Sequence, residues 1–519
     1  MLLIDFFDKG VGAFPDRLIV QSEHGALTHR EMDLLSRRVA AAIMAAGIKP
    51  DANVAIYSPN HIHCLTAFYG AIRAGAVWVP VNYRFVSADV LETINDLDVQ
   101  FLFFHSTLVP HVKEVLNRIS TMKGCVCLDQ NVDFAPSLTD WITPFAGAEN
   151  NNFPQRKSTD AVVMLTTSGT TGKPKGVMLS NRAYSTMIAS FRIRIPPREV
   201  ENHLVVSPLT HATGVYSTCL LSRGGTNFIV SEPDPLGVME AIQKFGITTL
   251  FLPPTLIYMM LAHPKVREFD FSSLRSMLYG GAPMSAQKLR EAMMIFGAIM
   301  YQIYGQSEAL MICTMMTAAD HQYALENKQY EGRLWSAGRE GPFARVEIMD
   351  ESGNILSPEQ PGEVVVRSDL VMECYYRNPE ATAEVSAHGW HHTGDVGRKD
   401  QDGFLYIMDR KKDMIISGGF NIFPTEVERA LLTHPSIQDC AVVGVPDEKW
   451  GEAVLAAVEL KQGASASTEE IIAYCKERLG SLKAPKKVEF VETLIRSTNG
   501  KVLRREVRAK YWKGRERNV

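Results

Sequence analysis

A segment rich in hydroxyl groups, glycine and lysine follows an apolar run. The run AVVML covers 161–165, and TTSGTTGKPKG covers 166–176. Glycine lets a backbone approach a ligand closely, hydroxyl groups donate hydrogen bonds and lysine supplies positive charge, so the segment could hold phosphate. It is not a Walker loop, because Pro174 follows Lys173 where that pattern needs Ser or Thr. Taken alone, the segment indicates either a phosphate site or a solvated turn.

The pentapeptide YGQSE at 304–308 carries three chemically useful groups. Tyr304 has an aromatic ring, Ser307 a hydroxyl group and Glu308 a carboxylate. A ring can stack on a base, a hydroxyl group can bond to a phosphate, and a carboxylate can coordinate Mg²⁺. In isolation the same residues are also typical of a strand end with polar caps.

Three further segments have chemistry of the same kind. YGGAP at 279–283 has adjacent glycines that let backbone approach a flat ligand, and a tight turn is the alternative. In HTGD at 392–395, Asp395 can accept two hydroxyl hydrogen bonds, and a turn or helix-cap aspartate is the alternative. NGKVLRRE at 499–506 contains Lys501, which is otherwise a surface lysine of a basic tail.

Seven segments in this order resemble the signature motifs of the adenylate-forming superfamily, which contains acyl-CoA synthetases, luciferases and peptide-synthetase adenylation domains. Together they are spread over most of the range 160–506. The segments are TTSGTTGKPKG, SPLTHATG (207–214), YGGAP, YGQSE, HTGD, DRKKDMIISGGFNIFPTEVE (409–428) and NGKVLRRE.

The resemblance implies an ATP or AMP site. Tyr304 would lie against adenine, Ser307 would contact the α-phosphate and Glu308 would hold Mg²⁺. Asp395 would bind the ribose and Arg410 the ribose or a phosphate. The remaining nucleotide residues implied are Thr167, Ser168, Gly169, Thr170, Thr171, Gly172 and Lys175 around the β- and γ-phosphates, Gly281, Ala282 and Pro283 beside adenine, and Gly305 and Gln306 in YGQSE.

The resemblance also assigns Lys501 as the main catalytic group of the first step. Attack of a carboxylate on the α-phosphorus of ATP brings two anions together, so a positioned cation stabilises the transition state. Lys412 aligns with the hinge about which the small C-terminal domain turns. The family more often has threonine at Ser307 and glycine at Cys374, and the loop before Lys501 differs from the usual pattern. We expect the change at Cys374 to alter a turn.

Other matching positions imply co-substrate sites. Gly418, Gly419, Trp450 and Arg84 match positions that contact CoA in some relatives, although a core tryptophan and a surface arginine are equally compatible with the last two. His211, Leu310 and Met311 match positions of the acyl pocket. Because Leu310 and Met311 are bulky and apolar, we expect a hydrophobic carboxylic acid, whether fatty, aryl or alicyclic, rather than acetate.

The elements that must position these groups are those of an α/β protein. Residues 28–46 predict an amphipathic helix with a capping box of Thr28 and Glu31 and with Gly47 just beyond. Short apolar runs alternate with helical stretches, which favours βα units and largely parallel sheets. These runs are 53–58, 161–167, 203–207 and 248–253.

The pattern of predicted elements changes near residue 341. Shorter, turn-rich strands predict a β-rich subdomain at about 341–409 within a large N-terminal AMP-binding domain, 1–409. The charged segment 410–413 would be a hinge, and 414–519 a mobile small α+β domain. This last domain would contain strands at 438–445, 453–460 and 487–491 and a helix opened by a capping box of Ser467 and Glu470.

Composition favours a small-molecule function. The chain has 519 residues, 46% of them hydrophobic, and a formal charge of −4, which gives no reason to expect nucleic acid or an anionic membrane as a partner. With neither a secretory signal nor a membrane span, we expect a cytoplasmic protein without integral membrane contact. The cysteines predict buried, reduced thiols. A monomer and a homodimer are both compatible with the sequence.

The leading hypothesis is an AMP-forming acid–CoA ligase that uses ATP, Mg²⁺ and coenzyme A on a small-molecule carboxylic acid. The alternative is an acyl-AMP ligase that delivers the acyl group to a carrier protein, although relatives of that kind carry an insertion that is not evident here. A nucleotide-binding sensor or scaffold is a third class. Retention of Glu308, Asp395, Arg410 and Lys501 argues against it, because binding alone does not require the lysine.

Overall fold

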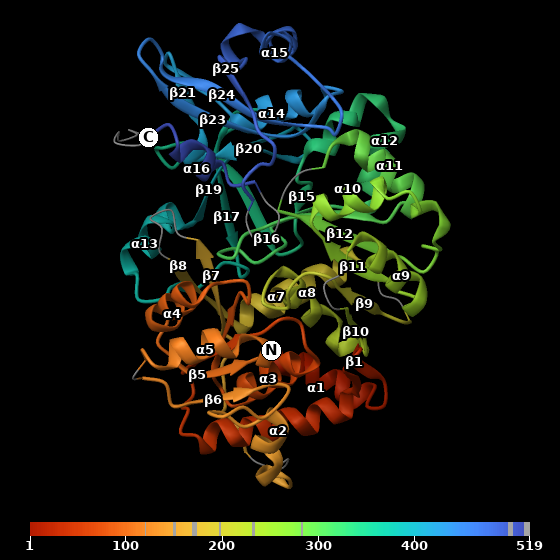
Figure 1. The fold of residues 1–519 in the computed structure, drawn as a ribbon, viewed down its shortest axis with the longest axis vertical. Coiled ribbons are helices and arrows are strands. Elements are labelled where there is room, and N and C mark those ends of the chain that lie inside the picture. Colours follow the sequence, from red (N-terminus) through yellow and green to blue (C-terminus); the bar gives the residue numbers. More distant parts are fainter. Residues whose placement is uncertain are drawn as a thin grey trace. The chain divides into compact units, whose positions relative to one another are not determined.

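The computed structural model describes residues 1–119, 121–148, 152–168, 174–196, 199–230, 234–281, 284–496 and 502–512. Contacts divide the chain into two units. The first comprises Met1–Val346 and Val366–His391, and the second comprises Glu347–Val365 and His392–Val519. Figure 1 labels many of the elements of both.

In the described part of the first unit, one sheet has seven strands. The strands β4, β3, β5 and β6 run parallel to one another and to β7, whereas β8 is antiparallel to both of its neighbours, β7 and β18. In spatial order the strands are β18 (Cys374–Tyr375), β8 (Pro174–Ser180), β7 (Ala161–Ser168), β4 (Val77–Val81), β3 (Asn53–Tyr57), β5 (Val99–Phe104) and β6 (Gly124–Cys127).

A second sheet of the first unit has nine strands among the described residues. Its middle strands are parallel, and antiparallel strands close both edges. In spatial order they are β15 (Arg339–Glu340), β14 (Thr314–Met316), β13 (Met300–Tyr304), β12 (Ser276–Gly280), β11 (Thr249–Leu252), β9 (Asn202–Val205), β10 (Thr226–Ile229), β1 (Leu18–Ser22) and β2 (Gly25–Thr28).

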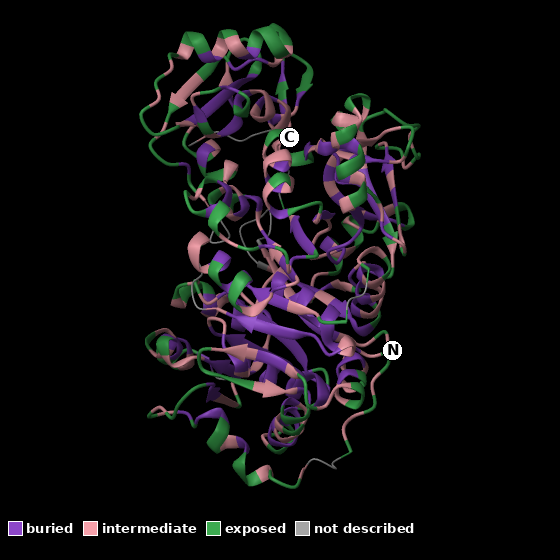
Figure 2. Cartoon of the chain, turned by 90° about the vertical axis from the view of Figure 1, so that its right-hand side faces the viewer, coloured by how far each residue is buried: buried purple, intermediate pink, exposed green. Residues whose placement is uncertain are grey.

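Both sheets are buried on both faces, which explains why their strands are apolar runs. Alternate residues of a strand point to opposite faces. Ile56 and Leu278, one from each sheet, share a core with α2 and α3, whereas Tyr57 and Met277 face two other cores. The first unit is therefore layered, with helices between the sheets and outside each of them, and Figure 2 shows its buried strands.

The helices of the first unit fall into these layers. α4 (Ser87–Asp96) and α5 (Val109–Leu116) cover the outer face of the seven-stranded sheet, and α9 (Pro235–Phe245), α10 (Pro254–Ala262) and α11 (Ala286–Phe296) cover that of the nine-stranded sheet. The inner helices are α1 (Leu3–Ala13), α2 (His29–Ala45), α3 (Ile62–Arg73), α7 (Asn181–Arg194) and α8 (Ala212–Ser217). Smaller helices are α6 (Leu138–Ile142), α12 (Ala318–Glu326), α13 (Pro379–Glu384), η1 (Ser106–Leu108), η2 (Thr143–Phe145), η4 (Thr218–Arg223), η5 (Val266–Glu268), η6 (Lys328–Trp335) and η7 (Ala387–Gly389).

The second unit contains most of a four-stranded sheet and a separate α+β sheet. The four-stranded sheet has the order β16 (Ala344–Met349), β17 (Gly362–Ser368), β19 (His391–Lys399) and β20 (Leu405–Arg410). After η8 (Lys411–Asp413) come β22 (Phe420–Ile422), β21 (Ile415–Ser417), β24 (Gly451–Leu460) and β23 (Ile437–Asp447) in spatial order, with β25 (Lys487–Phe490) beside β24. The helices are α14 (Pro424–Leu432), α15 (Thr468–Lys483) and α16 (Arg504–Ala509).

The predicted fold class is confirmed. α2 has the predicted capping box of Thr28 and Glu31, and α15 has that of Ser467 and Glu470. The predicted strands occur with ends shifted by a few residues. The two units group the β-rich sheet with the C-terminal part of the chain, so a boundary at 410–413 stays a prediction.

The eight cysteines are all free, and six of them are buried, which fits the predicted reduced thiols. Among the described helices, none is both long and apolar enough to span a bilayer.

Candidate active site

Three of the predicted motifs follow parallel strands of the nine-stranded sheet. SPLTHATG begins shortly after β9, Gly280 ends β12 with Gly281 just beyond it, and Tyr304 ends β13. Parallel strands place their carboxyl ends at one edge of a sheet, and ligands of open α/β sheets bind along that edge. The fold therefore brings segments separated by some 100 residues to one edge of the sheet, of which β9, β11 and β12 are labelled in Figure 1.

The loop after β13 is tightly folded. The Gln306 N–H donates to the Ala309 carbonyl (2.8 Å), and the Cys313 N–H donates to the Tyr304 carbonyl (2.9 Å). A Cβ at Gly305 would lie 2.6 Å from the backbone of Met311, which itself has a positive φ of 57°. Only glycine fits at 305, and the close approach holds Tyr304 through Glu308 in one short loop.

Glu308 in this loop has a tyrosine partner. The Tyr375 hydroxyl donates to Glu308 Oε1 at 2.8 Å, and the Met372 N–H donates to the Glu308 carbonyl at 2.8 Å. The ring of the same tyrosine has a cation near it, because Lys175 Nζ lies 4.9 Å from the ring centre. The side chains of Glu308 and Lys175, both predicted to act on ATP, are thus connected by Tyr375.

Lys175 belongs to the predicted phosphate segment, which is the end of a β-hairpin. β7 continues to Ser168 and β8 begins at Pro174, with Thr167 opposite Lys175 in antiparallel register. The sequence predicted a strand over 161–167, and β7 extends one residue further, to Ser168, which pairs with Pro174 of β8. Gly169, Thr170, Thr171 and Gly172 lie outside the described residues, as do Ala282 and Pro283, and Ser168 is described only as a strand residue.

His211 begins α8, and its ring Nδ1 lies 3.0 Å from Thr210 Oγ1. Burial, followed by the positive charge of Arg84, lowers the pKa of His211 to about 4, so the imidazole is neutral at pH 7. The loop before it is attached to Asn60, whose side-chain amide donates to the Ser207 carbonyl (3.1 Å) and whose oxygen accepts from the Leu209 N–H (2.7 Å). Arg84, a predicted CoA residue, and His211, a predicted acyl-pocket residue, are therefore electrostatic neighbours.

Leu310 and Met311 lie in the core between the two sheets of the first unit. They are 1% and 8% exposed and belong to the same cluster as Ile303 and Ile312. Their side chains are apolar and buried, as the predicted acyl pocket requires. Contact with an acyl group stays a prediction.

The second unit contains the predicted ribose residues. Asp395 and Arg410 are register partners in β19 and β20, and Arg410 Nε lies 2.6 Å from Asp395 Oδ1. Asp395 is buried, whereas the Arg410 side chain is largely exposed. The pair presents a carboxylate and a guanidinium group together at one end of this sheet.

Three of the predicted CoA residues lie together in the second unit. Gly418 and Gly419 form the two-residue turn between β21 and β22, with φ of 59° and 83°, a conformation that favours glycine. The Gly418 N–H donates to the Trp450 carbonyl (2.8 Å), and a Cβ at Gly418 would lie 2.6 Å from the Trp450 ring. The partly exposed indole thus packs on the glycine turn.

Lys412, the predicted hinge residue, is in η8, and burial is the main cause that lowers its pKa. Lys501 lies outside the described residues. The chain on either side of it is held, because Arg496 and Val502 pair in a β-bridge and the Leu503 N–H donates to the Ile495 carbonyl (2.8 Å).

Sequence reasoning missed two residues that organise these sites. Tyr375 is one. Arg504 is the other: its Nη1 donates to Asp409 (2.6 Å), its Nε donates to Glu428 (2.8 Å), and its Nη2 donates to Thr425 (2.9 Å). Arg504 lies inside the NGKVLRRE motif and Tyr375 next to Cys374, but the hydrogen-bond partners Glu308 of Tyr375 and Asp409 of Arg504 are 67 and 95 residues away, and no local pattern identifies them.

The described residues include no group of three or more His, Cys, Asp or Glu side chains arranged to hold a metal ion. A single partly exposed carboxylate, Glu308, still suits Mg²⁺, which usually binds through one or two carboxylates, substrate phosphates and water. The donor set of this loop therefore fits a Mg²⁺ ion that arrives with a nucleotide.

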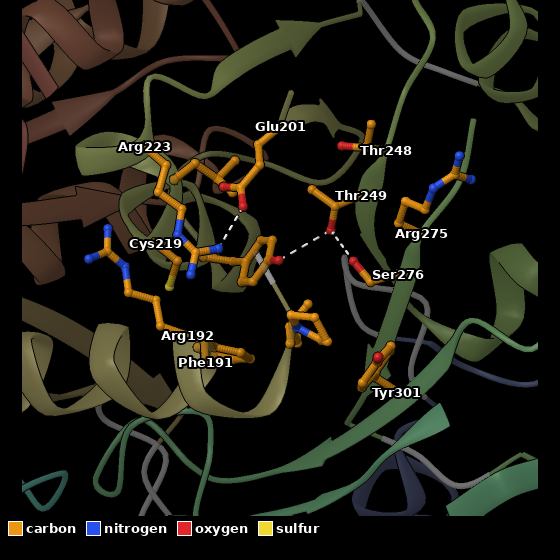
Figure 3. Close-up of a pocket in the computed structure, with 14 residues that line it drawn as sticks. Phe191, Arg192, Glu201, Cys219, Arg223, Thr248, Thr249, Arg275, Ser276 and Tyr301 are labelled. Atoms are coloured by element: carbon orange, nitrogen blue, oxygen red, sulfur yellow. Dashed lines mark hydrogen bonds and ion pairs between the residues drawn. The ribbon is translucent and has the colours of Figure 1, made fainter. Parts of the chain in front are cut away.

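A pocket lies at the opposite edge of the nine-stranded sheet (Figure 3). Glu201, Thr249, Ser276 and Tyr301, at or near the amino ends of four parallel strands, line it together with residues of α7, α8 and η4. Ser276 donates to Thr249 at 2.8 Å, and Glu201 pairs with Arg223 at 2.6 Å. It contains none of the predicted site residues. The motifs SPLTHATG, YGGAP and YGQSE lie at the other ends of these strands.

The chain is similar to known proteins over most of its length. A family model described as AMP-binding enzyme matches residues 7–376, and one described as AMP-binding enzyme C-terminal domain matches residues 426–501. A feruloyl-CoA synthase from Amycolatopsis sp is 34% identical over 514 residues, which are 97% of this chain and 99% of that protein. The fatty acid–acyl-carrier-protein ligase ScoC from Streptomyces coeruleorubidus is 32% identical over 510 residues, which are 97% and 95% of the two chains.

A solved structure has the same fold. The amide bond synthetase McbA from Marinactinospora thermotolerans matches with a TM-score of 0.88 and 30% identity, over 98% of this chain and 100% of that chain.

Proposed function

Because the chain belongs to the AMP-binding enzyme family, we propose that it is an ATP-dependent carboxylic acid–CoA ligase of the AMP-forming type. In the first half-reaction a carboxylate oxygen of the acid attacks the α-phosphorus of ATP, so that acyl-AMP forms and pyrophosphate leaves. In the second, the thiol of CoA loses its proton and its sulfur attacks the acyl carbonyl, so that a thioester forms and AMP leaves. Similarity to a feruloyl-CoA synthase over nearly the whole chain supports this activity.

One geometric observation carries the proposal. A carboxylate (Glu308) and a cation (Lys175), from segments far apart in the sequence, contact the same side chain, Tyr375, the first at its hydroxyl group and the second at its ring. A triphosphate needs such a pair, since its oxygens are bound by a cationic side chain and by a divalent cation that a carboxylate holds. When bound, Mg²⁺ would neutralise charge on the phosphate oxygens.

The other residues take roles that fit their surroundings. Tyr304 would stack on adenine beside the Gly281 backbone, with Gly305 and Gln306 in the same loop. Ser307 would donate to the α-phosphate, and Asp395 and Arg410 would bind the ribose. The glycine turn at Gly418 and Gly419, with Trp450 packed on it, would line the path of the CoA thiol, and Arg84 would contact its nucleotide part.

Lys501 would offset the repulsion between acid and α-phosphate in the first step. The short η8 turn containing Lys412 would be the hinge that exchanges the groups of the first step for those of the second. Arg508 supports one end of this turn by donating to the Lys412 carbonyl (3.4 Å) and to Asp413 (3.2 Å).

The acid is proposed to be hydrophobic, in the fatty, aryl or alicyclic class. The support is that Leu310 and Met311 are bulky and buried and that His211 is neutral, so none of the three provides a charge for a second polar group on the acid. Use of ATP and CoA as co-substrates fits the cytoplasmic location expected from the sequence.

A second candidate differs in the acceptor of the acyl group. The similarity to ScoC, a ligase that is specific for acyl carrier protein by its name, favours transfer to the phosphopantetheine thiol of a carrier protein. Both candidates share the first half-reaction and differ only in the thiol that attacks acyl-AMP.

A pyrophosphate-release assay with a panel of acids tests the proposal. Release with hydrophobic acids and not with acetate, accompanied by consumption of CoA and formation of a thioester, is the expected result. Release of pyrophosphate without CoA consumption, together with acylation of a holo carrier protein, would favour the second candidate. If no acid of the panel gives pyrophosphate, both candidates are wrong.

A further inference from the structure

We propose that Tyr375 is a positioning residue that orients the Glu308 carboxylate and thereby sets the affinity of this site for its divalent cation. The inference rests on the proposed function in one respect, namely that Glu308 holds the cation that accompanies ATP. It adds a residue of β18 that has no role in the motifs of the nucleotide site.

The backbone around Tyr375 connects two separate parts of the site. The Met372 N–H donates to the Glu308 carbonyl at 2.8 Å. The residues that follow Met372 pair with β8, the strand that contains Lys175. The Glu373 N–H donates to the Met178 carbonyl (2.9 Å), and the Tyr376 N–H donates to the Gly176 carbonyl (2.7 Å). The segment 372–376 therefore fixes the Glu308 loop relative to the strand that carries Lys175.

The structure around Cys374 in β18 differs from the sequence-based expectation. Cys374, where relatives have glycine, was expected to alter a turn, but it lies in extended β18, opposite Met178. An extended backbone does not require glycine, so cysteine fits there without strain. The extended backbone of β18, rather than a turn, therefore sets the direction of the next side chain, that of Tyr375.

The Tyr375 side chain lies between two groups of opposite charge. It is 7% exposed, its hydroxyl donates to Glu308 Oε1 at 2.8 Å, and its ring centre is 4.9 Å from Lys175 Nζ. The face of an aromatic ring attracts a cation, and a hydroxyl group donates to a carboxylate. A single side chain thus interacts with both charged groups, through a hydrogen bond to Glu308 and a ring contact with Lys175.

The hydrogen bond matters because a glutamate has three rotatable side-chain bonds. With one carboxylate oxygen held by Tyr375, less conformational freedom is lost when a cation binds. Groups that hydrogen-bond to a metal ligand typically contribute a factor of about 10 to 100 in metal affinity. A tyrosine that only fills space in the core would contribute nothing of this kind, and removal of its hydroxyl group separates the two roles.

The test compares Tyr375→Phe with Tyr376→Phe. The first change keeps the ring and removes the hydrogen bond to Glu308. The second is a matched control, because the neighbouring Tyr376 hydroxyl also donates to a carboxylate, Asp98 (2.9 Å), outside the nucleotide site. Binding of Mn²⁺ is measured by electron paramagnetic resonance with the full chain and an ATP analogue that cannot be cleaved between the α- and β-phosphates.

We expect Tyr375→Phe to weaken Mn²⁺ binding about tenfold and to raise the Mg²⁺ concentration for half-maximal pyrophosphate release by a similar factor. High Mg²⁺ should restore the rate, and Tyr376→Phe should bind Mn²⁺ like the wild type. In a Glu308→Gln background, Tyr375→Phe should have no further effect on the cation, because the group that it orients is gone.

Equal Mn²⁺ affinity of Tyr375→Phe and the wild type would overturn the inference, as would equal weakening in both tyrosine variants. The binding measurement involves no turnover, so its outcome is separate from that of the proposed function. A wild type that binds Mn²⁺ with the analogue, loses affinity in Tyr375→Phe and yet releases no pyrophosphate would support the role of Tyr375 while refuting the ligase.

Discussion

The two units hold their predicted catalytic segments by different interactions. In the first unit a neutral tyrosine, Tyr375, connects Glu308 to Lys175 through one hydrogen bond and one ring contact. In the second unit a charged residue, Arg504, pairs with Asp409 and Glu428 close to the segment that contains Lys501.

The charged cluster is the more costly one to break. The Asp409 side chain is 1% exposed and that of Glu428 is 14% exposed. Burial alone would lower the pKa of Arg504, but Glu428 and Asp409 more than offset it and raise the pKa. Removal of the guanidinium group would leave two carboxylates without their counter-charge, whereas removal of the Tyr375 hydroxyl would leave a partly exposed glutamate that water can solvate.

The difference suggests a division of tasks. A charged cluster makes the position of a segment rigid, which suits a catalytic lysine that must arrive in one orientation. A single hydrogen bond from a neutral donor leaves a carboxylate free to exchange partners, which suits a residue that must accept a cation and release it in each cycle.

The largest effect on stability is expected for Arg504→Met. It should lower the free energy of unfolding of the C-terminal part of the chain by about 3–5 kcal/mol, because it leaves Asp409 and Glu428 uncompensated. Urea denaturation, with hydrogen exchange to assign the affected segment, measures the loss. Arg505→Met is the matched control, since the Arg505 side chain is 63% exposed, and a similar loss in both variants would refute the idea of a special cluster.

Lys501→Ala should reduce the rate of adenylation on the order of 10²–10³-fold, because it removes a positioned cation from the transition state. Pyrophosphate release measures this step. Formation of the thioester from supplied acyl-AMP should stay close to the wild-type rate, since the lysine is not required after pyrophosphate has left. Equal loss in both half-reactions would show that Lys501 is needed for folding or for domain movement rather than for the first step.

Acid should weaken the first unit, in which every described histidine with a lowered pKa lies. His203 and His321 are fully buried, and burial is the main cause that lowers their pKa values to about 4. The unfolded chain takes up protons near pH 6.5 and the folded chain only near pH 4, so stability is present above pH 6.5 and is lost as the pH falls between these values. Each histidine should contribute a slope of about 1.4 kcal/mol per pH unit.

Denaturation at pH 7, 6 and 5, with hydrogen exchange to follow the first unit, measures this slope. The variant His203→Gln should lower the slope by the share of one histidine, because glutamine does not titrate. A slope that is unchanged in His203→Gln would contradict the assignment of the acid effect to buried imidazoles.

The smallest effect is expected for the stability of Tyr375→Phe. Loss of one hydrogen bond to a partly exposed carboxylate should lower the free energy of unfolding by about 1–2 kcal/mol. Tyr376→Phe should lose a similar amount, because Tyr376 makes the same type of bond to Asp98. If Tyr375→Phe proved as costly as Arg504→Met, the contrast between a neutral and a charged anchor would be wrong.

Much of the fold was predictable because its signals are local. The capping boxes of α2 and α15 need only residues three apart, and the apolar strands reflect burial on both faces of a sheet. Ends of strands were less predictable. The predicted run 161–167 ends one residue before β7 does, because Ser168 still pairs with Pro174 of β8, and the availability of a pairing partner is not a local property.

The candidate site was predictable where chemistry is written in consecutive residues. YGQSE places a ring, a hydroxyl group and a carboxylate in one loop, and Gly305 in its middle is required by the backbone of Met311. Tyr375 and Arg504 were not predictable, because each acts through a contact between segments that are distant in the sequence, and tyrosine and arginine occur in many other environments.

The amino-acid sequence by itself determined the α/β class, the kinds of groups available for nucleotide chemistry and their order along the chain, because composition, periodicity and short motifs are local quantities. Only the tertiary structure decided which of these groups meet. Parallel pairing brings the carboxyl ends of β9, β12 and β13 to a common edge of the sheet. β18 brings Tyr375 into contact with both Glu308 and Lys175, and Arg504 pairs with Asp409. The physical reason is that hydrogen bonds and ion pairs act over a few ångströms in space, whatever the separation along the chain.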